Sequence, residues 1–542
     1  MKSCFYSATR FSDPDEREQP QSPGTLLCAA AILMVVSVGM LWLGDKLSER
    51  EMVVTRFMAK GQATLTAQIQ AASAGRDQIT VVMYDQQFLG QTGSAWPISY
   101  QEHADWLLRL TSDPSARPKA VMLDITFGQD RADATLPAFR QALCKVQNAY
   151  KVPVFLAALP SPMTGKLTVR TGLGPEPGSS EPACFTLVGV DYLPDALDGV
   201  AWEYPMTRHL ADGTWRPGPP DARQEPVPPA YRSAAMAMAQ DAAQIDLGKE
   251  KAPMALVWGL KSAPQVDRPD SLSHCKPGAY DAWRYVPGVL RQLLAGPPTP
   301  ICPYHRTLSM AQLNELSEPA LASYLAGRYV LVGANVPAYN DFANSPIHGL
   351  IPGVHLHAMA LDNLLTYQGA YKQSTGWEPP QPAGLLVAGS LAVLAVFITH
   401  VLWWRLTAWL RERGPGWCRR MLARPQPPDK KSQVVKPGYW KAVAQRSWLA
   451  SLTAVGWLAR ITLQTIAAMT LIALLQSFFR IGMLPVVELV TMTLLAEGIG
   501  YMARLRWLLH GDIDKCNAQA ATELPSLPHQ EEHHETHTRP AV

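Results

Sequence analysis

The sequence predicts an α/β domain with a mainly parallel sheet, together with four transmembrane α-helices, one N-terminal and three C-terminal. Four segments of 19 to 23 residues carry almost no charge, and about 20 apolar residues cross a bilayer core ~30 Å thick. Between the first two of these segments, short β-branched runs alternate with stretches of helical periodicity. That alternation is typical of a parallel sheet covered by helices.

The predicted spans divide the chain into an N-terminal segment, an outer domain, a basic loop and a tail. Span 26–44 follows residues 1–25, and no small-residue cleavage site follows it, which argues against the alternative of a signal peptide. The domain is expected at 45–383. The remaining spans are expected at 384–404, 461–479 and 481–503, with loop 405–460 between the second and third and tail 504–542 after the last.

The basic residues of the loop predict which side of the membrane each part occupies. The stretch from Arg405 to Arg446 holds eleven Lys and Arg residues against Glu412 and Asp429, which indicates a cytoplasmic loop. Both termini are then cytoplasmic, and the domain is periplasmic. Residues 440–457 fit either an amphipathic helix on the membrane surface or an extension of the third span. Basic residues beside a span contact lipid rather than nucleic acid, so the lipid bilayer is the expected partner of this cluster.

Cysteine positions follow the same division. Four of the eight cysteines fall in the outer domain, where disulfides persist. Sequential pairing, which closes the shortest loops, predicts Cys144–Cys184 and Cys275–Cys302. The alternative is four buried free thiols.

The domain is expected to begin with a helix over 45–75 that leads into the first strand. Strands are predicted at 78–84, 119–124, 152–157 and 328–333, with helices at 102–110, 134–147 and 354–366. The middle, 160–300, is rich in Pro and Gly and predicts loops around a few elements, namely strands near 184–190 and 255–259 and a helix near 231–245.

Three sequence blocks occur in order along this domain. The first contains Asp85, Trp96-Pro97 and 120–127, the second is Asp198-Gly199-Val200, and the third runs from Arg328 to Ala358. They resemble the opening, middle and closing blocks of CHASE2 domains. The resemblance covers most of 78–366 and implies an extracytoplasmic sensor in a bacterial inner membrane.

The sequence departs from that family in two respects. Ile98-Ser99-Tyr100 stands where the family usually places a basic residue after its Trp-Pro block, which argues against an anionic ligand here. Family members commonly end in a cytoplasmic kinase or cyclase, whereas 39 residues follow the last predicted span, too few to fold as an enzyme. We therefore expect a non-enzymatic signal-input subunit.

Polar residues at the ends of the predicted strands are the candidate ligand-binding residues. Asp85 and Asp124 end parallel strands, where open α/β sheets bind ligands. The full candidate set is Asp85, Trp96, Asp124, Asn335, Asp341, Ser345 and His357. The alternative for each carboxylate is that it caps a helix or ties loops together.

Other candidate sites have weaker support in the sequence. Arg460 and Glu497 are expected to pair within the membrane, and Glu488 is an intramembrane carboxylate without an obvious partner. The string from His529 to His533 matches a zinc motif, but its polar, terminal context favours a solvated tail, so no metal and no cofactor are expected.

The sequence thus favours a sensor that binds an extracytoplasmic ligand and signals to a separate cytoplasmic protein through 405–447 or the tail. A homo-oligomer remains open. The alternatives are a scaffold of an envelope or secretion complex and, third, an extracytoplasmic hydrolase.

Overall fold

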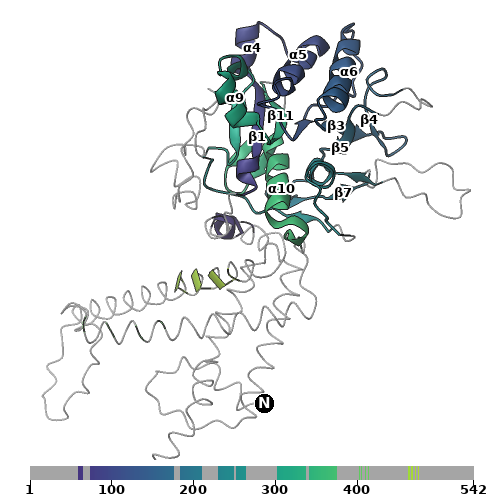
Figure 1. Ribbon diagram of the computed structural model, residues 1–542. Coiled ribbons are helices and arrows are strands. Elements are labelled where there is room, and N and C mark those ends of the chain that lie inside the picture. The colour runs from purple at the N-terminus through teal and green to yellow at the C-terminus, as the bar shows by residue number, and fades with distance from the viewer. Residues whose placement is uncertain are drawn as a thin grey trace, which may run out of the picture. The chain divides into compact units, whose positions relative to one another are not determined.

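The computed structural model describes one domain and a few helical positions beyond it (Figure 1). The described residues are 56, 59–64, 67, 74–175, 183–209, 230–248, 252–263, 302–336 and 341–374, with isolated positions between 402 and 474. The chain divides into two compact units, and this domain belongs to the unit formed by 44–380 with 468–487.

A parallel sheet forms the centre of the domain, with strand order β10-β1-β11-β2-β3 and β5 beside β3. A short strand, β4, pairs antiparallel with the end of β3. The strands are β1 (Ile79–Asp85), β2 (Ala120–Leu123), β3 (Val154–Pro160), β4 (Leu167–Thr168), β5 (Thr186–Gly189), β10 (Arg306–Ser309) and β11 (Tyr329–Asn335).

Three two-stranded sheets lie outside the main one. They are formed by β6 (Glu203–Tyr204) with β9 (Met254–Ala255), β7 (Thr207–Arg208) with β8 (Tyr231–Arg232), and β12 (Phe342–Ser345) with β13 (Gly349–Pro352).

The helices are short, and several continue as a 3-10 or π turn. They are η1 (Arg76–Gln78), α4 (Gln86–Thr92), α5 (Tyr100–Thr111), α6 (Leu136–Cys144), η2 (Lys145–Ala149), α7 (Ala234–Ala237), η3 (Met238–Ala242), η6 (Ala311–Asn314), α9 (Glu318–Leu325), α10 (Val354–Tyr367) and η7 (Gln368–Ala370). Helix α5 begins with a reciprocal cap, in which Ser99 accepts from the Glu102 N–H and Glu102 accepts from the Ser99 N–H.

Both faces of the sheet are buried, so its strands read as continuous apolar runs rather than alternating ones. In β1, Val81 and Met83 point to one core, which also contains α7 and α10. Val82 and Tyr84 point to the other core, which α5, α6 and α9 cover. This confirms the predicted α/β domain with a mainly parallel sheet.

The connections leave the carboxyl edge of the sheet toward opposite faces. Helices α5 and α6, which follow β1 and β2 in the chain, belong to one core, whereas α10, which follows β11, belongs to the other. Because β11 lies between β1 and β2, the connections that follow these neighbouring strands diverge to opposite faces at this edge. Open α/β sheets place their ligands at such a switch point.

The helical residues between 56 and 67 belong to the same unit as the domain and pack against it. Ala59, Ala63 and Ala67 are buried in the α10 core, which fits their spacing of four residues along one helix face. Arg56 forms an ion pair of 2.8 Å with Asp195; the Arg56 side chain is buried and that of Asp195 is partly buried. Lys60 lies 3.5 Å from Asp198 of the same loop.

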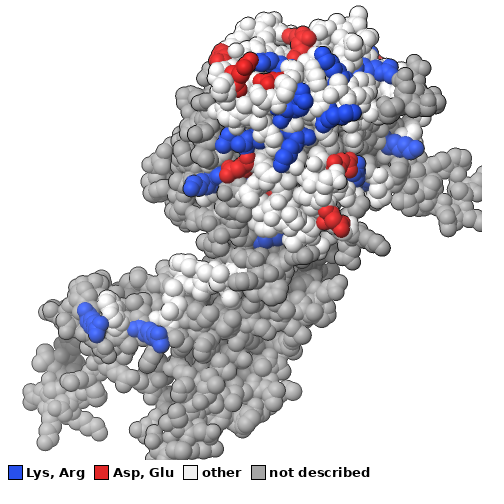
Figure 2. Space-filling model, viewed as in Figure 1, with Lys and Arg blue, Asp and Glu red and all other residues white. Residues whose placement is uncertain are grey.

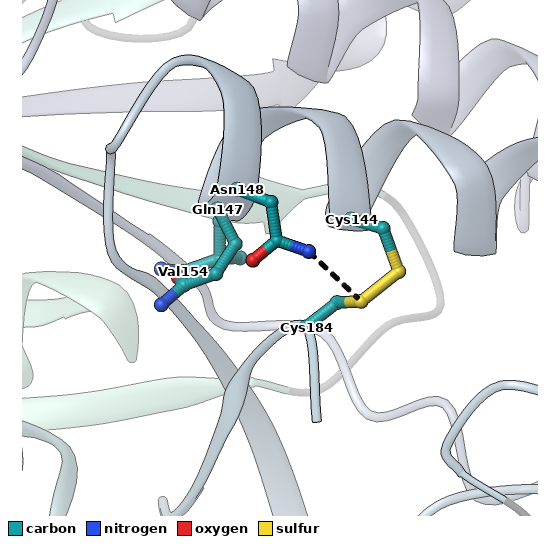
Figure 3. Close-up of a disulfide and its surroundings, with 5 residues drawn as sticks. All are labelled: Cys144, Gln147, Asn148, Val154 and Cys184. Atoms are coloured by element: carbon teal, nitrogen blue, oxygen red, sulfur yellow. Dashed lines mark hydrogen bonds between the residues drawn. A yellow bond between two sulfur atoms is a disulfide. The ribbon is translucent and has the colours of Figure 1, made fainter. Parts of the chain in front are cut away.

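A disulfide joins Cys144, the last residue of α6, to Cys184, two residues before β5 (Figure 3). The two Cα atoms are 4.6 Å apart, and the bond closes a 40-residue separation. This is the first of the two predicted pairs. Cys302 is also disulfide-bonded, while Cys275 lies outside the described residues.

The fold prediction needs one correction, because the four transmembrane helices are not supported. Among the residues that the structure describes, no helix is both long and apolar enough to cross a bilayer; α10, for example, has 14 residues, against the ~20 that a span needs. Predicted spans 26–44 and 481–503 lie outside the described residues, and 384–404 and 461–479 include only isolated described positions.

The sequence prediction missed several elements, among them strand β10 and helix α9. Strand β10 has four residues, of which only Leu308 is apolar, and helix α9 has eight residues. Neither is long enough to show a clear period of its own. Parallel pairing with β1, on the side away from β11, makes β10 the edge strand of the sheet.

Removing the Cys144–Cys184 bond should lower the stability of the domain. For a loop of this length, chain-entropy arguments give a loss of about 3–4 kcal/mol. The double variant Cys144→Ala/Cys184→Ala should therefore unfold at a lower temperature than the parent in a thermal melt without reductant. Cys418→Ala, which lies in the predicted cytoplasmic loop, serves as the control. Equal melting temperatures for the double variant and the parent would contradict the prediction.

Candidate functional site

Asp85 is used by the fold itself. It ends β1 and caps α4, since its Oδ1 accepts from the Phe88 N–H at 2.9 Å and from the Ser309 hydroxyl at 2.8 Å. Its side chain is completely buried. The bonds tie the ends of β1 and β10 together, which is the helix-capping alternative named for this residue.

Asp124 differs from Asp85 in having few partners. It follows β2 and is buried, and its Oδ2 has no hydrogen-bond partner among the described residues. Its Oδ1 lies 3.8 Å from Nε2 of His357, which is beyond hydrogen-bond distance. Native structures rarely leave a buried carboxylate oxygen without a partner, so this one requires an explanation.

His357 on α10 faces Tyr204 through Nδ1 and Asp124 through Nε2. The Tyr204 hydroxyl oxygen accepts from the Ala235 N–H at 3.2 Å and lies 2.8 Å from His357 Nδ1. In the tautomer in which Tyr204 donates to Nδ1, the ring proton lies on Nε2, the atom that faces Asp124. Burial lowers the pKa of His357 to about 4, so the ring is uncharged at neutral pH and its contact with Asp124 is not an ion pair.

Asp341 approaches the start of α10. Its backbone oxygen accepts from the Gly353 N–H at 2.8 Å, and its carboxylate lies so close to the Gly353 Cα that an added Cβ would be 2.3 Å from Oδ1. Only glycine permits this approach. A helix N-terminus favours a carboxylate electrostatically.

Asp124, Asp341, His357 and Tyr204 form what is here called the Asp124 cluster. Burial raises the pKa of Asp124 to about 7. Burial also raises the pKa of Asp341 to about 7, and the negative charge of Asp124 adds to that shift. The two carboxylates are therefore close enough to repel each other, and the cluster holds protons near neutral pH.

The other predicted ligand-binding residues are not part of this cluster, and one of them forms hydrogen bonds with backbone groups. Ser345 is buried and its hydroxyl accepts from the N–H groups of Ile347 and His348, which closes a turn. Trp96 packs its ring against Tyr84 at 5.7 Å. Asn335 ends β11 opposite Asp85 and is partly buried.

The structure adds residues that the sequence did not indicate. Asp191, just after β5, accepts from the Tyr231 hydroxyl at 2.9 Å and pairs with Arg208 at 2.7 Å. Its charge acts on His357, which places it beside the Asp124 cluster. Like Tyr204, it lies in the Pro- and Gly-rich middle of the chain, where no periodic pattern marked it.

Two arginines stand near the position where the family's basic residue is missing. The guanidinium carbons of Arg131 and Arg170 lie 4.0 Å and 5.3 Å from the centre of the Tyr100 ring. Arg170 also donates to the Tyr100 hydroxyl at 3.0 Å. Positive charge is thus present beside the Trp96-Pro97 turn, supplied by later segments of the chain.

The remaining candidate sites are not reached by the structure. Arg460, Glu488 and Glu497, together with the histidines of the tail, lie outside the described residues. Within the part of the chain that is described, no group of three or more His, Cys, Asp or Glu residues is placed to hold a metal ion.

Comparison with known proteins gives one family match. The model of the family described as CHASE2 domain matches residues 29–398, more than half of the chain. No curated protein and no solved structure matches the sequence.

The raised pKa of Asp124 predicts how stability depends on pH. An unfolded aspartate ionises near pH 4, whereas folded Asp124 stays protonated up to about pH 7. The folded state therefore binds more protons in this window, so the free energy of unfolding falls as pH rises from about 4 to 7 and levels off above. Asp124→Asn cannot ionise and should reduce that fall by about 1–4 kcal/mol.

Thermal unfolding across this pH range measures the effect. The control is Asp130→Asn, the same change at a side chain that is 87% exposed, which should leave the pH profile of the parent in place. A profile for Asp124→Asn that overlays the parent's would show that Asp124 is ionised in the folded protein.

Proposed function

Since the chain belongs to the CHASE2 domain family, we propose that it is an extracytoplasmic sensor that binds a ligand at the Asp124 cluster and signals to a separate cytoplasmic partner. CHASE2 is a family of extracytoplasmic sensor domains, so the sensory role follows from membership. The ligand site, the relay and the partner are the proposed parts.

The observation that carries the proposal is the unpartnered carboxylate oxygen of Asp124 at the carboxyl edge of the sheet. At the same edge, Asp85 accepts two hydrogen bonds through Oδ1, whereas Asp124 Oδ2 has no donor among the described residues. A ligand that donates a hydrogen bond, or carries positive charge, would complete the cluster and ionise the carboxylates. Such incomplete polar groups with shifted pKa values concentrate at functional sites.

A chain of contacts leads from the cluster to the 56–67 helix. Asp341 directly precedes β12, and the Asn344 oxygen of β12 accepts from the Ala201 N–H at 2.8 Å. Residues 195–201 form a loop closed on itself by the Asp195 and Asp198 carboxylates. The same two carboxylates contact Arg56 and Lys60. A shift of Asp341 on ligand binding would therefore displace the loop and the helix together.

The disulfides support the proposed compartment. Cys144–Cys184 and the bond at Cys302 form and persist in oxidising surroundings such as the periplasm. The proposed location is the periplasmic side of the bacterial inner membrane. The basic stretch 405–447 or the tail 504–542 is the proposed contact with the cytoplasmic partner, and a homo-oligomer remains compatible with this arrangement.

The scaffold alternative has one observation in its favour. Leu193 and Leu350 expose 72% and 69% of their surface; Leu350 pairs with Asn344 of β12, and Leu193 directly precedes the segment that leads into the 195–201 loop. Exposed leucines of this kind suit a protein partner. A scaffold would bind through that surface and would not need an ionisable Asp124.

The proposed ligand should stabilise the protein only when the cluster is intact. We expect the small-molecule fraction of a periplasmic extract to raise the melting temperature of the parent and of Asp130→Asn. Asp124→Asn and Asp341→Asn should lose this shift, because a neutral amide cannot form an ion pair with a positively charged ligand. A shift of equal size in all four proteins, or no shift in the parent, would remove the cluster as the sensing site.

The relay through Arg56 and Asp195 can be tested by exchanging their charges. In the parent, the amount of cytoplasmic partner captured through 405–447 should change when ligand is added. Arg56→Asp should abolish this change, because the new carboxylate would repel that of Asp195. The double variant Arg56→Asp/Asp195→Arg should restore the response. If the single variant responds like the parent, this ion pair is not part of the relay.

A further inference from the structure

Two arginines converge at the opposite, amino edge of the sheet. Arg306 begins β10, and Arg328 directly precedes β11, so they stand on either side of β1. Arg306 Nη1 and Arg328 Nε donate to the same acceptor, the backbone oxygen of Ser323, at 3.0 Å and 3.3 Å. Ser323 lies in the last turn of α9, where carbonyl oxygens lack helical partners and favour cations.

One carbonyl oxygen cannot satisfy two guanidinium groups. Each group has five N–H donors, and Arg306 Nε and Arg328 Nη1 are buried without a hydrogen-bond partner among the described residues. Burial lowers the pKa of Arg328, and the positive charge of Arg306 lowers it further. The two groups are therefore near enough to repel each other, which helix capping alone does not explain.

Among the described residues, no acidic side chain forms an ion pair with Arg306 or Arg328. Asp77 attracts Arg328, but Asp77 is already paired with Arg76 at 2.9 Å. Lys119 lies nearby, since its N–H donates to the Arg328 oxygen at 2.8 Å, and its ammonium group faces the Tyr329 ring. Basic and acidic side chains both lie on the face of the domain that Figure 2 shows.

We propose that Arg306 and Arg328 form a binding site for the phosphate group of an anionic ligand. Two guanidinium groups present their N–H donors to several oxygens of one phosphate, and its double negative charge offsets their mutual repulsion. Phosphate fits better than a carboxylate, because the pair carries two positive charges. Four of its six guanidinium nitrogens are also not engaged by the Ser323 oxygen. The site is separate from the Asp124 cluster, so it does not rest on the sensing role proposed above.

The test measures phosphate binding to the purified full-length protein by calorimetry. Arg306→Gln and Arg328→Gln should each weaken binding of inorganic phosphate by about tenfold or more, since each removes a positive charge and its charge-assisted hydrogen bonds. Arg328→Lys, which keeps the charge but loses the planar donor fork, should fall between. Arg140→Gln on α6 and Asp124→Asn should bind phosphate like the parent, and melting curves check that each variant is folded.

A second arm identifies the source of the phosphate. Flotation with phosphatidylcholine vesicles, with and without phosphatidylglycerol, is compared for the parent and Arg328→Gln. Binding that needs both phosphatidylglycerol and Arg328 assigns a lipid headgroup, whereas binding of inorganic phosphate alone assigns a soluble ligand. If the parent binds neither probe, or if folded Arg306→Gln and Arg328→Gln bind both as well as the parent, the proposal is overturned.

Discussion

The burial of both faces of the central sheet is the constraint on which the rest of the domain depends. Strands such as β1 are buried along their whole length, so polar groups and chain connections are confined to the two edges where the strands begin and end. At the carboxyl edge, the connection after β11 passes to one face while those after β1 and β2 pass to the other. Asp124 and Asp341 meet where these paths separate.

The carboxyl edge of the sheet holds Asp124 and Asp341, the amino edge holds Arg306 and Arg328, and helix ends explain part of this arrangement. The N-terminus of α10 faces Asp341 at the carboxyl edge, and the C-terminus of α9 faces Arg306 and Arg328 at the amino edge. Each helix end favours the charge that it receives. Neither end neutralises its cluster fully, however, because the two aspartates and the two arginines still repel within each pair.

Sequence patterns predicted the sheet better than the site. Apolar runs predicted β1, β2, β3 and β11, because a strand that is buried on both faces is apolar along most of its length. The two carboxylates at strand ends looked equivalent in the sequence, yet Asp85 caps α4 whereas Asp124 has no such partner. That difference depends on Ser309 and on the start of α4, so it appears only in the fold.

The residues that complete the Asp124 cluster were beyond sequence reasoning for a related reason. Tyr204 and Asp191 lie in a region without regular period, and short strands bring them beside His357. Apolar runs also led to the prediction of four membrane spans, which no helix in the described part of the chain supports. Local hydrophobicity therefore located the strands with long apolar runs, but it missed β10 and did not predict long-range polar contacts.

The alanine face of the 56–67 helix has a practical consequence for any shortened version of the protein. A fragment starting at residue 74 would retain every strand of the main sheet, yet Ala59, Ala63 and Ala67 would no longer cover the α10 core. It would also leave the Asp195 carboxylate without its guanidinium partner. Such a fragment would expose fresh apolar surface beside a carboxylate that has lost its ion pair, and it would be more prone to self-association than the intact chain.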